Sequence, residues 1–368
     1  MTKYFRRPAG VKDYLPSKVR KKRRIEKVIV DILEKWGYEE VIAPSFEYLE
    51  TFAKTGKSGF TEKVFKFFDR HGEVMALRPD ITTSIARMVA THYSNHDEPL
   101  RFYYMANVFR FQEPRKGRDQ ELYQIGGELI GIPGLEADVE IILLASYMLK
   151  QIGIKNFLIN IGHTKFLEGL LGELDDTPSL KDSIAQAIKE KNFVWLKNLI
   201  EKSTIRHDIK KIFLALPTFY GGSEIFDELV KFSLNEKCTE ALSELKRVWN
   251  MLKQFSNIQL TFDPGLARGI DYYTGIVFEI YSPQAGFPLG GGGRYDSLLD
   301  KFNGSRPATG FALTEDVILA VLERDIEDIY EPYLLYYNPA KYIEAFHKAE
   351  DLRKQGYTVK MVPTDKEL

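Results

Sequence analysis

The feature that most constrains the fold of this chain is a change of composition and hydrophobic pattern in its middle. Residues 165–256 are rich in Lys, Glu and Leu, have almost no strand pattern, and are broken by polar segments such as 175–178 and 221–222. The pattern predicts short helices over 179–190, 193–203, 223–232 and 237–254. Because strand-like segments lie on both sides of this block, the sequence predicts an α+β fold with a helical insertion.

Strand patterns and amphipathic helices surround this block. Before it, the sequence predicts a helix over 17–37, strands near 39–43, 101–111 and 121–131, and a buried helix over 135–151. After it, strand character returns at 258–262, 272–281 and 287–290, and helical periodicity at 315–324. Turn residues such as Pro283 and Gly286 separate the later strands, so we expect one antiparallel sheet that includes strands from both sides of the insertion.

The predicted helix over 17–37 has two distinct faces. Ser17 is the candidate N-cap and Gly37 the stop signal. The apolar face consists of Ile25, Val28, Ile29, Ile32, Leu33 and Trp36, and the basic face of Lys18, Arg20, Lys21, Lys22, Arg23 and Arg24. A basic helix face is usually solvated, and the alternative is a contact with nucleic acid or with a protein partner.

The end of the chain has a third hydrophobic pattern, which differs from the two described above. Residues 333–337 read as a strand, 340–355 as a helix and 357–362 as a second strand. This βαβ-like unit is short for an independent domain. We therefore expect a main domain over 1–325, which includes the insertion at 165–256, and a short C-terminal unit over 326–368.

The charge balance and the cysteine count limit the functional class. The chain has 51 Lys and Arg against 52 Asp and Glu, a net charge of −1, and lacks the positive field that usually accompanies nucleic-acid binding. A single cysteine, Cys238, excludes an internal disulfide and indicates a reducing compartment. No apolar run suits a membrane helix, and the first residues do not form a secretory signal. We expect a cytoplasmic protein, and the scattered histidines predict no metal site.

A first candidate site lies in the segment 77–83. Pro79 fixes the backbone, and Asp80 and Thr82 would point the same way from an extended segment. An acid beside a hydroxyl suits an ammonium group. The alternative is a turn in which these side chains only cap the following helix.

A second candidate site follows the predicted strand near 101–111. Arg110 lies among aromatic residues, and a buried guanidinium requires a carboxylate partner in the protein or on a ligand. In the next strand Gln124, Gly126 and Glu128 share one face by the period of two. Such a polar row is either exposed to solvent or the floor of a small-molecule site, and the sequence leaves both open.

A third candidate site combines residues 267–275 with the glycine-rich stretch 290–296. Glycines let a ligand approach the backbone closely, and the run lacks the Gly-Lys-Ser/Thr sequence of a phosphate loop. Arg268, the pair Tyr272 and Tyr273, and Tyr295 could wall a flat pocket for an aromatic or imidazole ring. The alternative is a packed glycine-rich turn with aromatic residues in the core.

Together the three stretches resemble the catalytic domain of class II aminoacyl-tRNA synthetases, specifically the histidyl-tRNA synthetase type, over about residues 5–325. Pro44 and Glu47 are similar to the dimer-interface motif 1, Arg110 lies where motif 2 has its phosphate-contacting arginine, and 268–273 and 292–296 are similar to the two histidine-specific signatures. The resemblance implies a histidine pocket made by Asp80, Thr82, Arg110, Gln124, Glu128, Arg268, Tyr272, Tyr273 and Tyr295.

Departures from the synthetase pattern concern the residues that would hold ATP. Gln112 stands where motif 2 has a glutamate, Glu113 where it has an arginine, and Val317 where motif 3 has its ATP-contacting arginine. Removing such an arginine weakens transition-state stabilisation by about 3–4 kcal/mol, by analogy with an oxyanion-hole donor. The C-terminal unit is also too short for an anticodon-binding domain, so tRNA is an unlikely ligand.

The variant motifs, among them 77–82 and 107–114, resemble instead the regulatory subunit family of ATP phosphoribosyltransferase, a relative of the synthetase. This resemblance implies a non-catalytic subunit without a cofactor, which activates a short-form catalytic phosphoribosyltransferase in a hetero-octamer and takes part in feedback inhibition by L-histidine. It also implies a homodimer through the motif 1 region. The alternatives are a histidyl-tRNA synthetase catalytic core and a stand-alone histidine sensor with another partner.

Overall fold

The computed structural model describes residues 6–55, 62, 64–111, 119–174, 178–232, 234–255, 258–266, 272–322 and 330–364. It contains two compact units, Met1–Arg324 and Asp325–Leu368, which are described separately below. Within the described ranges no helix is both long and apolar enough to cross a membrane.

The first unit is built on an eight-stranded sheet with the strand order β1-β5-β6-β11-β10-β9-β7-β8. Its strands are β1 Glu39–Glu40, β5 Leu100–Phe109, β6 Glu121–Ile130, β7 Leu158–His163, β8 Leu260–Phe262, β9 Ile276–Tyr281, β10 Gly290–Arg294 and β11 Ala308–Thr314. Neighbouring strands are antiparallel except at the two ends, where β1 pairs with β5 and β7 with β8 in parallel. The prediction that strands from both sides of the insertion share one sheet is confirmed.

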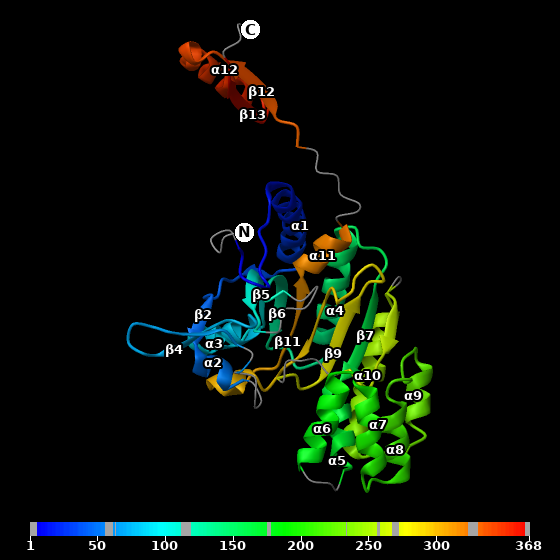
Figure 1. The fold of residues 1–368 in the computed structure, drawn as a ribbon. Coiled ribbons are helices and arrows are strands. Elements are labelled where there is room, and N and C mark those ends of the chain that lie inside the picture. Colours follow the sequence, from blue (N-terminus) through cyan, green and yellow to red (C-terminus); the bar gives the residue numbers. More distant parts are fainter. Residues whose placement is uncertain are drawn as a thin grey trace. The chain divides into compact units, whose positions relative to one another are not determined.

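Helices cover the two faces of this sheet unequally. Helices α4 (Leu135–Gln151) and α11 (Glu315–Leu322) pack on one face, and α1 (Pro16–Lys35) lies across them (Figure 1). On the other face α3 (Thr82–His92) covers the β5 end, where Ile85 and Val89 join the core residues of that strand.

A small antiparallel sheet lies beside α3. It has the order β2-β4-β3, with β2 Phe46–Tyr48, β3 Lys66–Phe68 and β4 Val74–Leu77. Helix α2 (Leu49–Ala53) packs against it, and Phe52, Val64 and Ala76 form its core.

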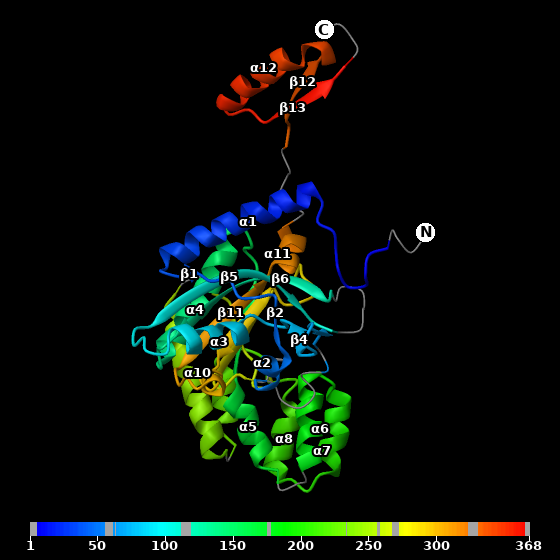
Figure 2. The same ribbon diagram turned by 90° about the vertical axis from the view of Figure 1, so that its left-hand side faces the viewer.

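The predicted helical insertion is confirmed. It consists of α5 Thr164–Gly172, α6 Pro178–Lys189, α7 Phe193–Lys202, α8 His207–Ala215, α9 Glu224–Leu229 and α10 Glu236–Lys253. Figures 1 and 2 show α5 to α8 gathered at one end of the first unit, with α1 at the opposite end. Helices α5 and α8 were not among the predicted helices, although α8 buries Ile209, Ile212 and Phe213 at helical spacing.

The predicted cap of the first helix is wrong. Helix α1 begins at Pro16, and its N-cap is Leu15, whose side chain makes no capping hydrogen bond. Pro16 occupies the first helical position, where a missing N–H costs nothing because that group would be unpaired anyway. Ser17 therefore lies inside the first turn. Gly37 follows the helix with φ +79°, as the predicted stop requires.

The predicted strand over 287–290 is also misplaced, because the glycine run itself forms β10. A Cβ on Gly292 would lie 1.9 Å from the carbonyl oxygen of Gly310, so only glycine fits between the neighbouring strands. The alternative of a packed glycine-rich turn is wrong for 290–293 for the same reason, but its aromatic residues do lie in the core, because Tyr272 and Tyr295 belong to a buried hydrophobic cluster. Strand propensity disfavours glycine, and close strand packing overrides it here.

The second unit has the predicted strand–helix–strand order. Strands β12 (Tyr333–Tyr337) and β13 (Val359–Pro363) pair in parallel, and α12 (Tyr342–Lys354) connects them. Its core is small and consists of Leu335, Ala349 and Val359.

Candidate functional site

The candidate site lies on the face of the large sheet that α3 covers only in part. The strand register places Tyr104 of β5 opposite Gly126 of β6, and Glu128 of β6 opposite Gly310 of β11. Gln124 and Glu128 are 6% and 1% exposed, so the alternative of a solvent-exposed polar row is wrong. A polar row on a buried sheet face requires partners or a ligand.

Glu128 is the centre of the site. One of its carboxyl oxygens accepts a hydrogen bond from the Thr82 hydroxyl at 2.6 Å, and the other accepts one from the Tyr295 hydroxyl at 2.5 Å. Burial raises the pKa of Glu128 to about 8, against the lowering effect of these two donors. The glycine at position 310 makes room for this side chain, because a Cβ there would lie 1.7 Å from Glu128 Oε2.

Asp80 has two different carboxyl oxygens. Oδ1 accepts a hydrogen bond from the backbone N–H of Thr83 at 2.8 Å, so the helix-capping alternative is confirmed for this oxygen. Oδ2 is buried and has no hydrogen-bond partner among the described residues. Burial raises the pKa of Asp80, and hydrogen bonding by Thr83 together with the nearby charge of Arg110 opposes this rise. A buried carboxyl oxygen without a donor is costly unless a ligand supplies one.

Three tyrosines form one wall of the site. The Tyr272 ring lies 5.7 Å from the Tyr295 ring in an edge-on arrangement and 5.1 Å from the Tyr273 ring, measured between centroids. Burial raises the pKa of Tyr272 and of Tyr295 well above the usual value for a phenol. Both hydroxyls therefore stay protonated and act as hydrogen-bond donors at neutral pH.

A buried ion pair fixes the position of Tyr295. The neighbouring Arg294 guanidinium contacts Asp138 of α4 at 2.8 Å and donates to the carbonyl oxygen of Gly134 at 2.7 Å. Asp296 accepts a hydrogen bond from the backbone N–H of Ala308 at 2.9 Å. Both neighbours of Tyr295 are thus held by the protein, and its side chain is directed to Glu128.

Arginines hold the segment 77–83 against β5. Arg78 donates to the carbonyl oxygens of Ala43 at 2.6 Å and of Asn107 at 2.8 Å. Arg110, directly after β5, donates from Nε to the carbonyl oxygen of Pro79 at 3.1 Å. This contact is with a backbone carbonyl oxygen beside Asp80 and not with the carboxylate that the sequence predicted.

The structure brings most of the predicted residues together. Asp80, Thr82, Glu128, Tyr272 and Tyr295 form one connected group, Gln124 lies on the same buried face, and Tyr273 packs beside Tyr272. Arg268 lies outside the described residues, as do Gln112 and Glu113 of the motif 2 region.

Two residues of the site were missed by sequence reasoning. Tyr104 is fully buried over Gly126, where a Cβ would lie 2.4 Å from its hydroxyl oxygen. The pairing of a glycine with a tyrosine across the predicted hairpin would have indicated it. The role of Arg78, which binds the carbonyl oxygens of Ala43 and Asn107, had no sequence signal beyond the position of an arginine next to Pro79.

The arrangement suits a small cation with a ring that can donate hydrogen bonds. Asp80 and Glu128 supply acceptors, the tyrosines supply ring faces and hydroxyl donors, and the glycines of β10 and β11 keep the floor of the site low. The described part of the site offers acceptors and phenols rather than the cluster of cations that a triphosphate requires.

Comparisons with known proteins agree with this geometry. A family model described as histidyl-tRNA synthetase matches residues 10–318. An ATP phosphoribosyltransferase regulatory subunit from Moorella thermoacetica is 39% identical over 355 residues, which are 96% of this chain and 90% of that protein. One from Desulforamulus reducens is 36% identical over 362 residues, 97% of this chain and 90% of that protein.

A solved structure from Bacillus halodurans, titled as an ATP phosphoribosyltransferase regulatory subunit/histidyl-tRNA synthetase, superposes with a TM-score of 0.87. It is 30% identical in sequence and covers 100% of this chain and 95% of that chain. The matches to these three proteins thus cover 96–100% of this chain.

Proposed function

This chain belongs to the histidyl-tRNA synthetase-like family, among the regulatory subunits of ATP phosphoribosyltransferase, and on this basis we propose that it is the non-catalytic, histidine-sensing subunit of such an enzyme. It activates a short-form catalytic subunit at the first step of histidine biosynthesis and takes part in feedback inhibition by L-histidine. The proposed assembly is a hetero-octamer.

The observation that supports a histidine site best is the buried Oδ2 atom of Asp80, which has no donor among the described residues. The α-ammonium group of an amino acid supplies three N–H donors to such an atom. Thr82 and Glu128 lie beside it, and the two ring nitrogens of an imidazole match a carboxyl group and a tyrosine hydroxyl. In this proposal Gln124 and the tyrosines contact the ring, and Arg110 and Arg268 provide positive charge for the ligand carboxylate.

The absence of adenylate chemistry is the second part of the proposal. Val317, in α11, has no charge to offer a triphosphate, and the sequence places Gln112 and Glu113 where the synthetase has Glu and Arg. We therefore expect no histidine-dependent exchange of pyrophosphate into ATP by the purified chain. Exchange at a synthetase-like rate would support the alternative of a histidyl-tRNA synthetase.

Asp80→Asn tests the histidine site. The amide keeps the oxygen that accepts from Thr83 N–H, but it replaces the unpartnered oxygen by an N–H₂ group and removes the charge. We expect calorimetric titration to show histidine affinity reduced by about 30-fold or more, which corresponds to about 2 kcal/mol for loss of one partner of a buried charge pair.

A matched control is Asp69→Asn. Asp69 also accepts backbone N–H groups through one oxygen, from His71 at 2.8 Å and Glu73 at 2.9 Å, but in the turn between β3 and β4. It should bind histidine as the unmodified chain does. Equal affinities for all three proteins would contradict the site, and failure to co-purify with a short-form catalytic subunit would favour a stand-alone sensor.

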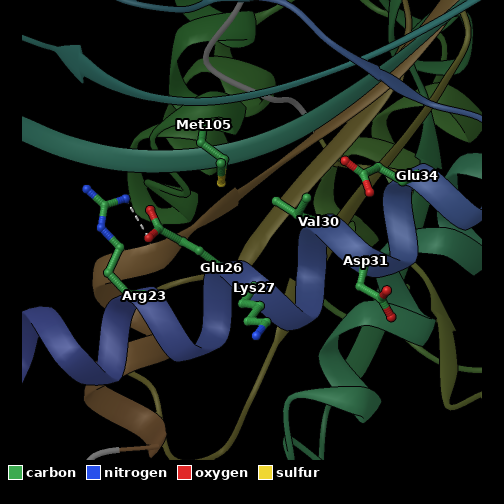
Figure 3. Close-up of a pocket in the computed structure, with 7 residues that line it drawn as sticks. All are labelled: Arg23, Glu26, Lys27, Val30, Asp31, Glu34 and Met105. Atoms are coloured by element: carbon green, nitrogen blue, oxygen red, sulfur yellow. Dashed lines mark hydrogen bonds and ion pairs between the residues drawn. The ribbon is translucent and has the colours of Figure 1, made fainter. Parts of the chain in front are cut away.

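We also propose a homodimer through the region of α1 and Pro44. Figure 3 shows a hollow of about 400 Å³ along α1, with Val30 of the helix and Met105 of β5 near its centre. Arg23, Glu26 and Lys27 lie toward one end, where Arg23 pairs with Glu26 at 2.8 Å, and Asp31 and Glu34 lie toward the other, where Asp31 pairs with Lys35 at 2.6 Å. A second copy related by a twofold axis near Val30 would set Lys27 of one helix against Glu34 of the other.

Exposed aromatic residues next to Pro44 support the same proposal. Phe46 and Tyr48 of β2 are 50% and 55% exposed, and Phe111 is 56% exposed. Phe46 and Phe67 of β3 are in ring contact, with centroids 5.6 Å apart. A surface of this kind is rarely left in water by a monomeric protein.

A further inference from the structure

The helical insertion begins and ends beside the tyrosine wall of the site. Strand β7 ends at His163, and α5, the first helix of the insertion, begins at the next residue, Thr164. Strand β8, which follows the last helix α10, pairs with β7 in parallel. The two chain segments that connect the insertion to the sheet are therefore neighbours.

Thr164 holds the end of the tyrosine segment. Its backbone N–H and its hydroxyl both donate to the carbonyl oxygen of Gly275, at 3.0 and 3.2 Å. Gly275 follows Tyr272 and Tyr273 closely in the sequence, and the next residue, Ile276, pairs with His163 in the sheet. The first residue of the insertion thus fixes the point at which the tyrosine wall joins β9.

Gly162 supports the segment on the other side of residues 267–271. A Cβ at this position would lie 2.7 Å from the carbonyl oxygen of Asp263 and 2.8 Å from Cβ of Leu266. The backbone N–H of Asp263 also donates to the carbonyl oxygen of Ile161 at 3.0 Å. The described segments before and after 267–271, which contains Arg268, therefore both rest on 161–164.

His163 ties the two ends of the insertion together. Its side chain is fully buried, and Nδ1 accepts a hydrogen bond from the backbone N–H of Lys165 at 3.1 Å. Nε2 must therefore carry the proton, which it donates to Glu244 of α10 at 2.8 Å. This hydrogen bond holds the pKa of Glu244 below its usual value.

Helices α5 and α10 are in close contact along their length. A Cβ on Gly169 of α5 would lie 2.5 Å from the sulfur of Cys238 in α10. Asn235 donates to the carbonyl oxygen of Gly169 at 2.9 Å, and the Cys238 thiol to that of Phe166 at 3.4 Å. A displacement at the start of α5 is therefore passed to α10, since the pair leaves no space between its backbones.

We propose that Thr164 is a positioning residue for the tyrosine wall, and that through residues 162–164 the helical insertion responds to occupancy of the histidine site. The inference rests on the proposed function, which places L-histidine against Tyr272 and Tyr273. Histidine stabilises one position of the tyrosine wall, and Thr164, His163 and Glu244 extend that effect to α5 and α10. Because such coupling is reciprocal, the contacts that histidine strengthens in the insertion raise the affinity for histidine by the same free energy.

Hydrogen exchange on the full chain, with and without L-histidine, tests this inference. We expect histidine to slow exchange of the backbone N–H groups of α5 and α10, which are distant in sequence from Asp80 and Glu128. Thr164→Val removes only the hydroxyl donor to Gly275, and Glu244→Ala removes the partner of His163. Both should lose the exchange response of α10 and weaken histidine binding by about fivefold or more, the lower end of typical coupling.

The matched control is Thr239→Val. Thr239 lies in α10, and its hydroxyl also donates to a backbone carbonyl oxygen, that of Asn235, at 2.8 Å. This variant loses the same kind of bond within the insertion but should keep the response. Binding of histidine without any exchange response in α5 and α10 would overturn this inference and leave the histidine site intact. Absence of histidine binding by the unmodified chain would overturn both.

Discussion

At the scale of single residues, the protonation of Glu128 has a consequence for stability. The folded chain holds a proton on this group up to a pKa of about 8, whereas an unfolded glutamate loses it near pH 4.5. The contribution of Glu128 to stability is therefore complete below about pH 4.5 and is lost as the pH rises to about 8. Asp138 and Glu315, whose pKa values burial raises to about 6 and 7, act in the same direction.

Glu128→Gln separates this effect from the others, because the amide imitates the protonated acid without titrating. We expect the free energy of unfolding of the unmodified chain to fall more steeply between pH 6 and 9 than that of the variant. At pH 9 the variant should be the more stable of the two. Urea unfolding at several pH values measures this, and parallel pH profiles would show that Glu128 is ionised in the folded chain.

Single-residue chemistry was predictable where a charged or hydroxyl residue stood in an otherwise apolar strand. Thr82 and Tyr295 each form a hydrogen bond with Glu128, and the sequence had indicated all three residues as site candidates. The sequence could not indicate that Oδ1 of Asp80 caps α3, whereas Oδ2 has no donor among the described residues. That division depends on the side-chain orientation and not on residue type.

At the scale of elements, the N-cap of α1 is a position where a substitution should stabilise the folded chain. Leu15 has the extended backbone of an N-cap, with φ −76° and ψ 161°, yet its side chain is 68% exposed and caps nothing. Leu15→Ser supplies a side-chain acceptor for the N–H groups of the first turn. We expect a gain of about 1 kcal/mol in the free energy of unfolding, measured by urea denaturation.

Ser17→Ala is the matched control, since Ser17 was the predicted cap and lies inside the helix. We expect its effect on stability to stay within about 0.5 kcal/mol, the range of ordinary surface substitutions. A loss near 1 kcal/mol at Ser17, with no gain at Leu15, would show that the helix begins two residues later than in this structure.

Elements were predictable where periodicity and local propensity agree. Helix α4 has its predicted bounds because it is apolar almost all round and follows Gly134. Strand β10 was misplaced, because five residues that include four glycines have no intrinsic preference for a strand. Only the close approach of β9 and β11 on either side makes that segment extended, and this is a property of the sheet.

At the scale of the whole molecule, the sequence predicted the sheet and the helical insertion of the first unit and the strand–helix–strand order of the second. It did not predict that β7 and β8, on opposite sides of the insertion, pair in parallel and bring its two ends together. Pairing between residues about a hundred positions apart is a long-range contact, which local patterns do not encode. The proposed link between the insertion and the proposed histidine site depends on this pairing and on the hydrogen bonds of Thr164 with Gly275 and of His163 with Glu244.

The charge distribution along α1 gives a test of the homodimer. Lys27 and Glu34 lie toward opposite ends of the hollow in Figure 3, so a twofold axis near Val30 would pair each with the other in the second copy. Lys27→Glu places like charges together and should raise the dimer dissociation constant about tenfold or more, measured by sedimentation. Adding Glu34→Lys reverses both ends and should restore the dimer. Lys197→Glu, the same change at an exposed site on α7, should have no effect. A monomer before any substitution would contradict the homodimer, and a single variant as dimeric as the unmodified chain would place the dimer interface elsewhere.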